Sequence, residues 1–526
     1  MKKSNRLSLL IFLFLIIAIF YPLLVMLIKV EWNTFPDLLA SDAFKNAFNN
    51  SLLVTSIATI LSVGIAYLLA FTLNRTHIEH RALLKVFLTL PMLIPSISHG
   101  LGLINLFGSN GIISSYFGFD IIGKSGIILG SILYSFPVAF LMLDDGFNYI
   151  DNTMYDSAKV LGMNKWEIFK NVTMCYMKKP LLSSIFAVFT LIFTDYGVPL
   201  AVGGKFITLP VFLYKEVIGL LDFSRGTMIG LFLLIPAFIS FLFDNFSKDY
   251  SFGEFSKDFK ISKNKMRDTI LTIFVYLIIT FIFLIIGSFI FYAFIDNVTL
   301  NRVFSLKHFE YVLSNNLGLY IFNSLLIALL VSIVGTIIAY ATAYYTARIK
   351  GNVSKIAHIL TIVSLAIPGI VLGLSYTIAF HNNFIYNTYL ILIIVNIVHF
   401  IASPYLMAYN ALQKVNPNYE VVAKTCCIKP LRIIIDVIIP CTKKTIREMF
   451  AYFFVNSMIT ISAVAFLFNT KTMPLSLMIN QYEGNLMLGE AAIVSLAILV
   501  FNIIVKGSVY LINRKEHRRM MYANNV

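Results

Sequence analysis

Long apolar stretches recur along the whole chain, separated by shorter polar segments. An α-helix needs about 20 mainly apolar residues to cross the hydrocarbon core of a bilayer. The pattern predicts twelve membrane-spanning helices with approximate cores at residues 9–30, 50–74, 84–107, 125–147, 181–203, 226–243, 269–294, 319–346, 356–380, 386–411, 448–468 and 490–512. Because lipid cannot satisfy exposed backbone N–H and C=O groups, such segments are helical. We therefore expect an all-α integral membrane fold with twelve transmembrane helices.

Composition and charge agree with this prediction. The 526 residues are 58% hydrophobic and 13% charged, which is too apolar for a protein with a water-exposed surface. The net charge of +15 does not indicate nucleic-acid binding, since the basic residues lie in short loops between apolar stretches. Alternate loops hold 31 and 8 Lys and Arg residues. Basic loops favour the cytoplasm, so both termini are predicted to be cytoplasmic, and we expect a multi-pass protein of a bacterial inner membrane.

The two halves of the chain resemble each other. Residues recur at an offset of 273 and then of 265, as Asn50-Ser51 with Asn323-Ser324, Ala66-Tyr67 with Ala339-Tyr340, Arg75 with Arg348, Pro95 with Pro368, Gly100 with Gly373, Ala158-Lys159 with Ala423-Lys424, and Lys178-Lys179 with Lys443-Lys444. Chance similarity between apolar helices would not repeat Pro, Gly and Arg at constant spacing. We predict two tandem parallel six-helix repeats, 1–245 and 268–526, joined by a cytoplasmic linker at 246–267, with a pathway between them.

Each half has a longer polar loop between its fourth and fifth predicted helices, at residues 151–180 and 414–447. In the first loop Asp156 is followed by small and apolar residues and then by Gly162, a pattern typical of a short helix with a left-handed glycine cap. A second short helix is expected to follow in each loop. One such loop would be weak evidence, but two at equivalent positions predict paired helical knobs that can transmit motion.

These loops resemble the EAA coupling motif of binding-protein-dependent ABC importer permeases, in which E-A-A-x-x-x-G is followed by I-x-L-P. The motif positions hold Asp156, Ser157, Ala158 and Gly162 in the first loop, and Val421, Val422, Ala423 and Cys427 in the second, with Glu420 one place earlier and Pro440 at the end. Cys427 replaces the motif glycine, and Cys175 replaces the motif proline in the first loop. The resemblance implies that each loop docks on one of two copies of a cytoplasmic ATP-binding subunit.

The same resemblance implies further partners and a substrate class. MgATP would be bound by the ATPase, so no cofactor is expected in this chain, and an extracytoplasmic binding protein would deliver the solute. The double-length layout resembles permeases for iron(III), thiamine and 2-aminoethylphosphonate, and residues 193–199 look most like the 2-aminoethylphosphonate branch. We expect a small hydrophilic solute, with 2-aminoethylphosphonate first. No catalytic or metal-ligating constellation is apparent, which predicts that the chain is not itself an enzyme.

Five residues inside predicted spans are candidates for the transport pathway. Paired Pro and Gly interruptions in the third helix of each half often mark a pathway but can equally set kinks for packing. Burying an acidic side chain in a spanning segment costs free energy, so such a residue suggests a functional role. Alternatively, the side chain can hydrogen-bond within the bundle or lie at the outer mouth of the pathway. The candidates are Pro95, Gly100, Asp195, Pro368 and Gly373.

Other interpretations carry less weight. An ion-coupled secondary transporter needs polar groups near the bilayer midplane in both halves, and these are sparse; a membrane scaffold does not explain the duplicated loops. Residues 118–125 fit the phosphate-binding pattern G-x-x-x-x-G-K-S but precede a spanning helix, where that pattern is not expected to bind nucleotide. Asp144 and Asp145, at the end of the fourth helix, are expected to be solvated.

Overall fold

The computed structural model describes residues 2–109, 111–114, 120–148, 150, 152–246, 261, 264–297, 301–349 and 351–524. Among these residues eight helices are long and apolar enough to cross a membrane, and two bent helix pairs would make ten. The described part of the chain has a single pair of strands, so the predicted all-α membrane fold is confirmed. The linker predicted at 246–267 lies mostly outside the described residues, as do Gly118 and Phe119 of the phosphate-loop-like pattern.

The elements follow each other in two similar series, in which η marks a 3₁₀ or π turn. The first series is α1 (Lys2–Leu15), η1 (Ile16–Phe20), α2 (Tyr21–Ile28), α3 (Phe35–Ala40), α4 (Asp42–Arg75), α5 (Arg81–Leu88), η2 (Leu90–Leu93), α6 (Ser96–Phe107), α8 (Lys124–Asn148), α9 (Asn152–Val160), α10 (Lys165–Ile168), η3 (Phe169–Thr173), α11 (Met174–Phe193), α12 (Gly197–Val202), α13 (Leu209–Tyr214), η4 (Lys215–Gly219) and α14 (Phe223–Phe246).

The second series begins with α15 and is interrupted by a small hairpin. It is α15 (Lys265–Phe294), β1 (Ile295–Asn297), β2 (Asn301–Phe304), α16 (Lys307–Ser314), α17 (Leu317–Arg348), α18 (Asn352–Val363), η5 (Ser364–Ala366), α19 (Gly369–Phe380), α20 (Tyr389–Phe400), α21 (Ala402–Lys414), α22 (Asn418–Thr425), α23 (Pro430–Ile433), η6 (Ile434–Ile438), α24 (Ile439–Ile459), α25 (Leu475–Gly484) and α26 (Leu488–Asn524). Strands β1 and β2 are antiparallel.

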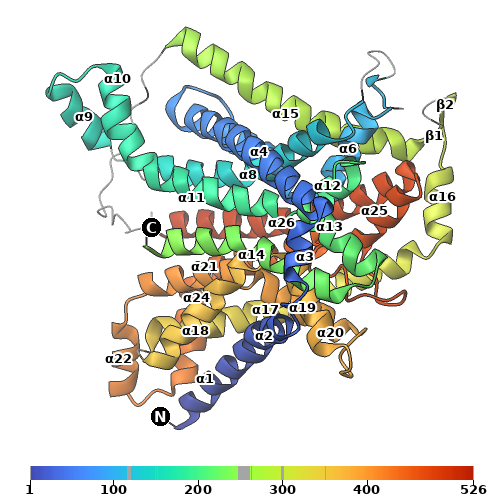
Figure 1. Ribbon diagram of the computed structural model, residues 1–526. Coiled ribbons are helices and arrows are strands. Elements are labelled where there is room, and N and C mark those ends of the chain that lie inside the picture. Colours follow the sequence, from blue (N-terminus) through green and yellow to red (C-terminus); the bar gives the residue numbers. More distant parts are fainter. Residues whose placement is uncertain are drawn as a thin grey trace.

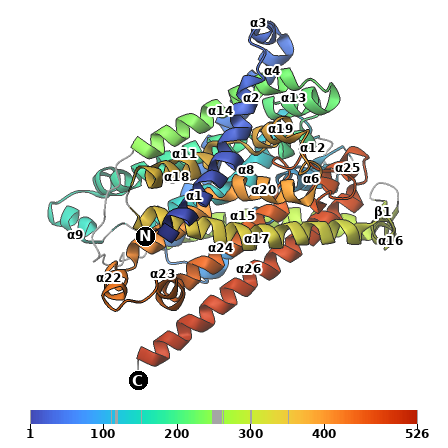
Figure 2. The same ribbon diagram turned by 90° about the horizontal axis from the view of Figure 1, so that it is seen from below.

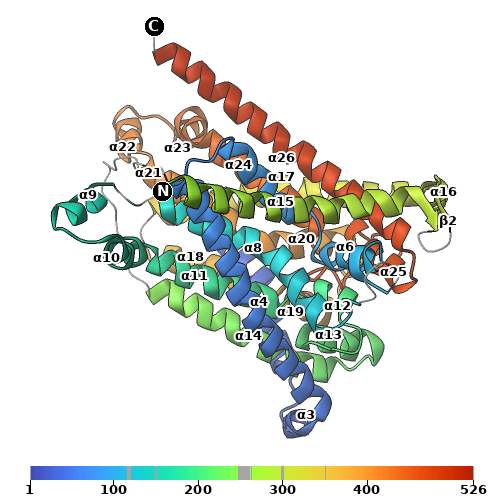
Figure 3. The same cartoon turned by 90° about the horizontal axis from the view of Figure 1, so that it is seen from above.

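The bundle has two distinct ends. Both chain termini and the short helices α9, α10 and α22 lie at one end, which we call the termini end (Figure 1), and Figure 2 places α23 there too. The hairpin β1–β2 and α16 lie at the other, the hairpin end, as Figure 2 also shows. The last part of α26 projects beyond the bundle at the termini end (Figure 3). The two loops predicted to be equivalent therefore lie on the same side of the molecule.

The first helix of each series packs on the opposite half. Helix α2 packs on α19, and α15 packs on α6, α5 and α4. Pro22 in α2 has no N–H, which frees the carbonyl oxygen of Ala18, and the Tyr376 hydroxyl of α19 donates to that oxygen at 2.6 Å. The hydrophobic core also joins the two halves, because Val275 and Ile279 of α15 belong to a cluster formed mainly by α4 and α8 of the first half. The two halves are thereby interlocked.

Five of the predicted spans are not continuous helices, and one of them, 386–411, is bent by 53° between α20 and α21. The segment 356–380 is divided at Pro368, where α18 with η5 and then α19 are bent by 112°, and 84–107 is divided between η2 and α6. Proline disfavours a helical conformation in the residue before it, which explains both breaks. The spans predicted at 181–203 and 448–468 end early, at Phe193 and Ile459. Apolar composition did not reveal these ends because the segments that follow are also apolar.

The repeated Asn-Ser pair has the same structural role in both halves. The backbone N–H of Leu209, which begins α13, donates to Ser51 Oγ at 2.6 Å. The N–H of Leu475, which begins α25, donates to Ser324 Oγ at 2.6 Å. A buried helix start needs such a partner because its first N–H groups have none within the helix. The sequence match therefore reflects a shared packing of the short helices α13 and α25 on the long helices α4 and α17.

His308 connects the hairpin to the start of α26. Its Nε2 lies 3.0 Å from the carbonyl oxygen of Ile295, and its Nδ1 lies 3.0 Å from a carboxylate oxygen of Glu490. Both oxygens accept hydrogen bonds, so both ring nitrogens donate and the ring is the charged imidazolium. The hydrogen bond to Glu490 accordingly raises the pKa of His308 above its ordinary value.

We expect the stabilisation by His308 to weaken as pH rises. Because its pKa is raised in the folded protein, the contribution is complete below the unfolded value of about 6.5 and is lost as pH rises through the folded value. The measurement is the melting temperature of wild type and His308→Gln between about pH 5 and about pH 9. The difference between the two proteins should be largest at the acidic end; a difference that grows toward the alkaline end would contradict the assignment.

Candidate functional site: the paired coupling loops

The first coupling loop, residues 152–180, folds as two short helices that lead into α11. Helix α9 ends in a turn at Gly162, whose φ of +74° is left-handed. Helix α10 then begins with a capping box, in which Asn164 Oδ1 accepts from the N–H of Glu167 at 2.9 Å and the Glu167 carboxylate accepts from the Asn164 N–H at 2.8 Å. These local bonds fix the angle between the two short helices.

The second coupling loop, residues 414–447, folds in the same way. Helix α22 ends at a turn in which Cys427 has a φ of +54°. The closing bonds match: the N–H of Met163 donates to the Ala158 carbonyl at 3.1 Å, and the N–H of Ile428 donates to the Ala423 carbonyl at 2.8 Å. Both turns are thus Schellman caps, and the cysteine takes the conformation of the motif glycine.

We expect Cys427→Gly to stabilise α22. A side chain in the left-handed region costs about 1–2 kcal/mol, of which the greater chain entropy of glycine offsets part. A net gain of about 1 kcal/mol would slow amide hydrogen exchange in residues 418–428 about fivefold if exchange follows local opening. The matched change Gly162→Ala should accelerate exchange in α9, because no atom lies within 4 Å of the added Cβ and only the backbone strain acts. Faster exchange in Cys427→Gly would contradict the cap.

An arginine at the end of a long helix holds each loop against the bundle; Arg75 is buried and the Arg348 side chain is 9% exposed. Arg75, at the end of α4, lies with its guanidinium carbon 5.7 Å from the ring centre of Tyr155 in α9. Arg348, at the end of α17, lies with Nε 3.5 Å from a carboxylate oxygen of Glu420 in α22. The arginines are 273 residues apart, and Tyr155 and Glu420 are 265 apart, so the two contacts are equivalent. One uses a cation–π interaction and the other an ion pair.

The predicted motif residues divide into inward and outward sets. Ala158 and Ala423 are buried against the bundle. Asp156 is exposed and pairs with Lys159 at 3.3 Å, whereas Glu420 faces Arg348 and accepts from the Tyr344 hydroxyl at 3.1 Å. Glu420 therefore positions α22 and does not take the place of Asp156 on the exposed face. The remaining motif positions are Ser157 and Val422, which are exposed on α9 and α22, and Pro440, which is in the first turn of α24.

The outer faces of both loops carry exposed apolar side chains. Trp166 of α10 is 69% exposed and Leu431 of α23 is 67% exposed, and the two positions are equivalent at the offset of 265. Val160, Val421 and Val422 extend these faces. Apolar side chains at matching places on two knobs at one end of a bundle are typical of a surface covered by a protein partner.

A π turn joins each knob to its spanning helix. The turn η3 precedes α11 and the turn η6 precedes α24, again at an offset of 265. Such turns inside helices occur often at functional sites. The four cysteines lie near this end: Cys175 and Cys441 are in the first turns of α11 and α24, and all four cysteines are exposed.

The paired Pro and Gly residues serve packing at the breaks in the third helices. Pro95 and Pro368 directly precede α6 and α19. A Cβ on Gly100 would lie 2.7 Å from Ala201 Cβ, and one on Gly373 would lie 2.8 Å from the Ala463 carbonyl oxygen. Each glycine thus permits close approach of the segment that follows the fifth span. A role in the transport pathway stays a prediction.

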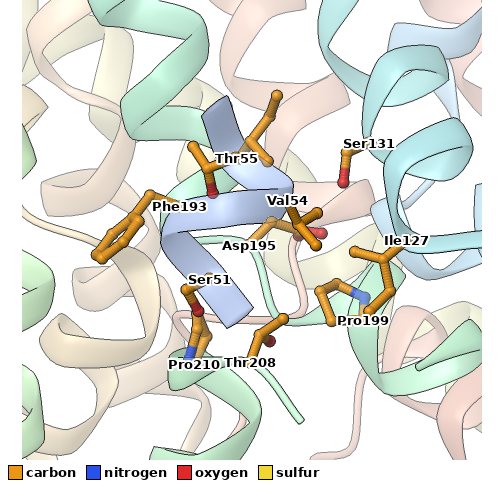
Figure 4. Close-up of a pocket in the computed structure, with 11 residues that line it drawn as sticks. Ser51, Val54, Thr55, Ile127, Ser131, Phe193, Asp195, Pro199, Thr208 and Pro210 are labelled. Atoms are coloured by element: carbon orange, nitrogen blue, oxygen red, sulfur yellow. The ribbon is translucent and has the colours of Figure 1, made fainter. Parts of the chain in front are cut away.

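Asp195 caps a helix and lines a small pocket. Its carboxylate accepts from the N–H groups of Gly197 and Val198 at 3.3 and 3.0 Å, which fixes the start of α12. The pocket has an empty volume of about 210 Å³, including space open to solvent. Hydroxyl groups of Thr55 and Ser131 point toward the same space as the carboxylate (Figure 4). These hydrogen bonds explain why an acidic side chain is placed inside the bundle at Asp195. A role of Asp195 in the transport pathway stays a prediction.

Asp144 differs from its predicted state. It is only 5% exposed and not solvated, because Lys85 Nζ lies 2.6 Å from one carboxylate oxygen and Asn74 Nδ2 lies 2.7 Å from the other. The contact joins α4, α5 and α8 at the termini end. Sequence position alone suggested a free helix end because its two partners are 59 and 70 residues away.

Comparison with known proteins decides the family. The pattern of the binding-protein-dependent transport system inner membrane component matches residues 62–251 and 335–518, more than half of the chain. The chain belongs to this family. Two copies of the domain in one permease agree with the internal repeat and with the paired loops.

Several curated relatives resemble the permease at low identity. The ferric transport system permease protein FbpB of Actinobacillus pleuropneumoniae is 25% identical over 494 residues, 88% of this chain and 71% of the relative. A putative ferric permease of Haemophilus influenzae is 24% identical over 88% of this chain and 77% of its own. The thiamine permease ThiP of the same organism is 24% identical over 48% of each chain. The ferric and thiamine permeases belong to the group predicted from the sequence.

Proposed function

We propose that this permease forms the complete translocation pathway of an ATP-driven importer. The observation that carries the proposal is the pair of equivalent helical knobs at one end of the bundle, each held by an arginine from the end of a long helix and each with exposed apolar side chains. Two copies of a cytoplasmic ATP-binding subunit would dock there, one on each knob. The termini end is then cytoplasmic, as the distribution of basic residues predicts.

The proposed cycle is alternating access between the two halves. Closure of the two ATPase subunits on MgATP brings the knobs together, and the π turns transmit this movement to α11 and α24. The halves rock about their interlocked first helices, and the pathway opens toward an extracytoplasmic binding protein. Hydrolysis takes place in the partner, so the permease itself is not an enzyme.

The substrate proposed is a small hydrophilic solute. The segment 193–199 favours 2-aminoethylphosphonate, and iron(III) and thiamine follow. Iron(III) gains support from the ferric permeases that match 88% of this chain. Thermal-shift screening of the cognate binding protein against these three solutes would rank them, because a ligand that binds only the folded state raises the melting temperature.

Uptake by reconstituted vesicles tests the function. Permease co-purified with its ATPase is placed in liposomes with ATP inside, and the solute and its binding protein are added outside. We expect uptake to require both ATP and binding protein and to be unaffected by ionophores. Uptake that proceeds without ATP and collapses with the ion gradient would replace this proposal with ion-coupled secondary transport.

A further inference from the structure

The pocket beside Asp195 differs from the matching region of the second half. It lies among α4, α8, α12 and α13, and every residue that lines it belongs to the first half. Thr55 matches Ala328 at the repeat offset of 273, and Asp195 matches Thr460 at the offset of 265. The second half thus has neither the carboxylate nor the Thr55 hydroxyl at this place. The duplicated fold does not require a carboxylate here, so its presence in the first half needs a separate explanation.

No basic side chain neutralises Asp195 within the part of the chain that the structure describes. Its carboxylate accepts from two backbone N–H groups and from the Ser96 hydroxyl, all of which are uncharged donors. The titratable side chains with which it interacts, Tyr134 and Tyr196, are phenols and stay neutral at physiological pH. None of the ion pairs between described residues includes Asp195. An ionised carboxylate inside an apolar bundle is costly without a positive partner.

Two hydroxyls that line the pocket have no hydrogen-bond partner among the described residues. These are Ser131 Oγ and Thr208 Oγ1, although the residues are only 1% and 4% exposed. A buried hydroxyl without a partner costs free energy, so such a group needs an explanation, for which a bound ion or an ordered water are candidates. Figure 4 shows both residues, with Thr55, around the side chain of Asp195. The pocket therefore gathers uncommitted oxygen atoms beside an uncompensated negative charge.

We propose that this pocket binds one alkali-metal cation. Its donors are a carboxylate and hydroxyl oxygens, which suit a hard cation and not a soft transition metal. A single positive charge neutralises the single carboxylate, whereas a divalent ion would leave a positive charge buried in the bundle. The bound ion joins α4, α8 and the segment that follows the fifth span, and so stabilises the first half. The competing state is a protonated Asp195 beside an ordered water. The proposal does not depend on the import function, because the whole site lies within one half.

Direct binding to the full-length permease tests the site. Detergent-solubilised protein is dialysed to equilibrium against radioactive sodium ions in N-methylglucamine buffer, without ATP or solute. We expect saturable binding of about one ion per chain, the number that one buried carboxylate requires, and competition by potassium ions. Asp195→Asn should abolish saturable binding, and because asparagine also caps helices, the start of α12 should survive. A wild-type protein that binds no ion, or a variant that binds like wild type, would overturn the proposal in favour of the protonated state.

The melting temperature gives a second measurement that separates the ligands from the charge. Wild type should melt about 2 °C or more higher in sodium or potassium chloride than in N-methylglucamine chloride of equal ionic strength. Thr55→Val with Thr208→Val keeps the carboxylate but removes two oxygen donors. The concentration that gives half of the shift should therefore rise at least about tenfold.

Asp144→Asn is the matched control, because this buried carboxylate already has Lys85 as its cation at 2.6 Å. The variant should melt at a lower temperature than wild type but keep the full shift between the salts. A shift that persists in Asp195→Asn would be a general salt effect, and the cation site would then be ruled out.

Discussion

Trp166→Asp combined with Leu431→Asp is expected to leave the permease in the membrane without its ATPase. Both side chains lie on the second short helix of a coupling loop, and each is about two-thirds exposed. Large apolar and aromatic side chains at the centre of an interface contribute about 2 kcal/mol or more each. A buried aspartate adds the cost of desolvating an unpaired charge. Affinity for the ATP-binding subunit should therefore fall by at least about 100-fold.

Co-purification of the ATPase with the detergent-extracted permease measures this effect. Each single variant should retain partial association, because one knob of the pair remains intact. Phe384→Asp provides the control, since it puts the same charge on an exposed apolar residue at the opposite end of the bundle. ATPase recovery at the wild-type level with the double variant, in protein of normal abundance, would rule out the assigned docking faces.

The coupling loops were predictable from sequence, but the contacts that hold them were not. Local signals in residues 151–180 and 414–447 predicted short helices, and the left-handed cap predicted at Gly162 is confirmed. The same turn at Cys427 was not predicted, because the motif glycine is missing there. The anchoring contacts join residues far apart in the chain. Although Arg75 and Arg348 match at the repeat offset, their partners Tyr155 and Glu420 differ in chemistry, so the match of the arginines did not reveal them.

For the spanning segments too, the sequence predicted the helices but not the contacts between them. Apolar length located the long helices such as α4, α17 and α26, because it measures what lipid requires. It did not locate the ends of α11 and α24 or the bend at Pro368. It also did not show that α2 and α15 pack on the opposite halves, since apolar helix faces look alike in sequence. The one local signal was Pro22, which frees a carbonyl for Tyr376.

Arg348→Ala is expected to uncouple the second loop far more severely than Arg75→Ala uncouples the first. The Arg348 guanidinium lies 3.5 Å from Glu420 and donates to the Val415 carbonyl at 2.8 Å. Removing one partner of a largely buried ion pair leaves the other charge unpaired, at a cost of about 3–5 kcal/mol. Arg75 has only neutral partners, since it lies over the rings of Tyr155 and Phe147 and donates to the Phe147 carbonyl at 3.3 Å. Loss of a cation–π contact costs about 0.5–2 kcal/mol, and removal of Arg75 strands no charge.

Hydrogen exchange in α9 and α22 gives the direct comparison, with ATP-dependent uptake as the functional readout. At about 3 kcal/mol, opening of α22 would become more than about 100-fold more frequent in Arg348→Ala, and uptake should fall in parallel. In the double variant Arg348→Ala with Glu420→Ala, no carboxylate is left unpaired, so protection of α22 should partly return. Equal loss of protection in the single and double variants would mean that Arg348 acts through Val415 alone. The restored protection would instead show that the stranded charge of Glu420, and not the missing arginine itself, is what releases the knob from the bundle.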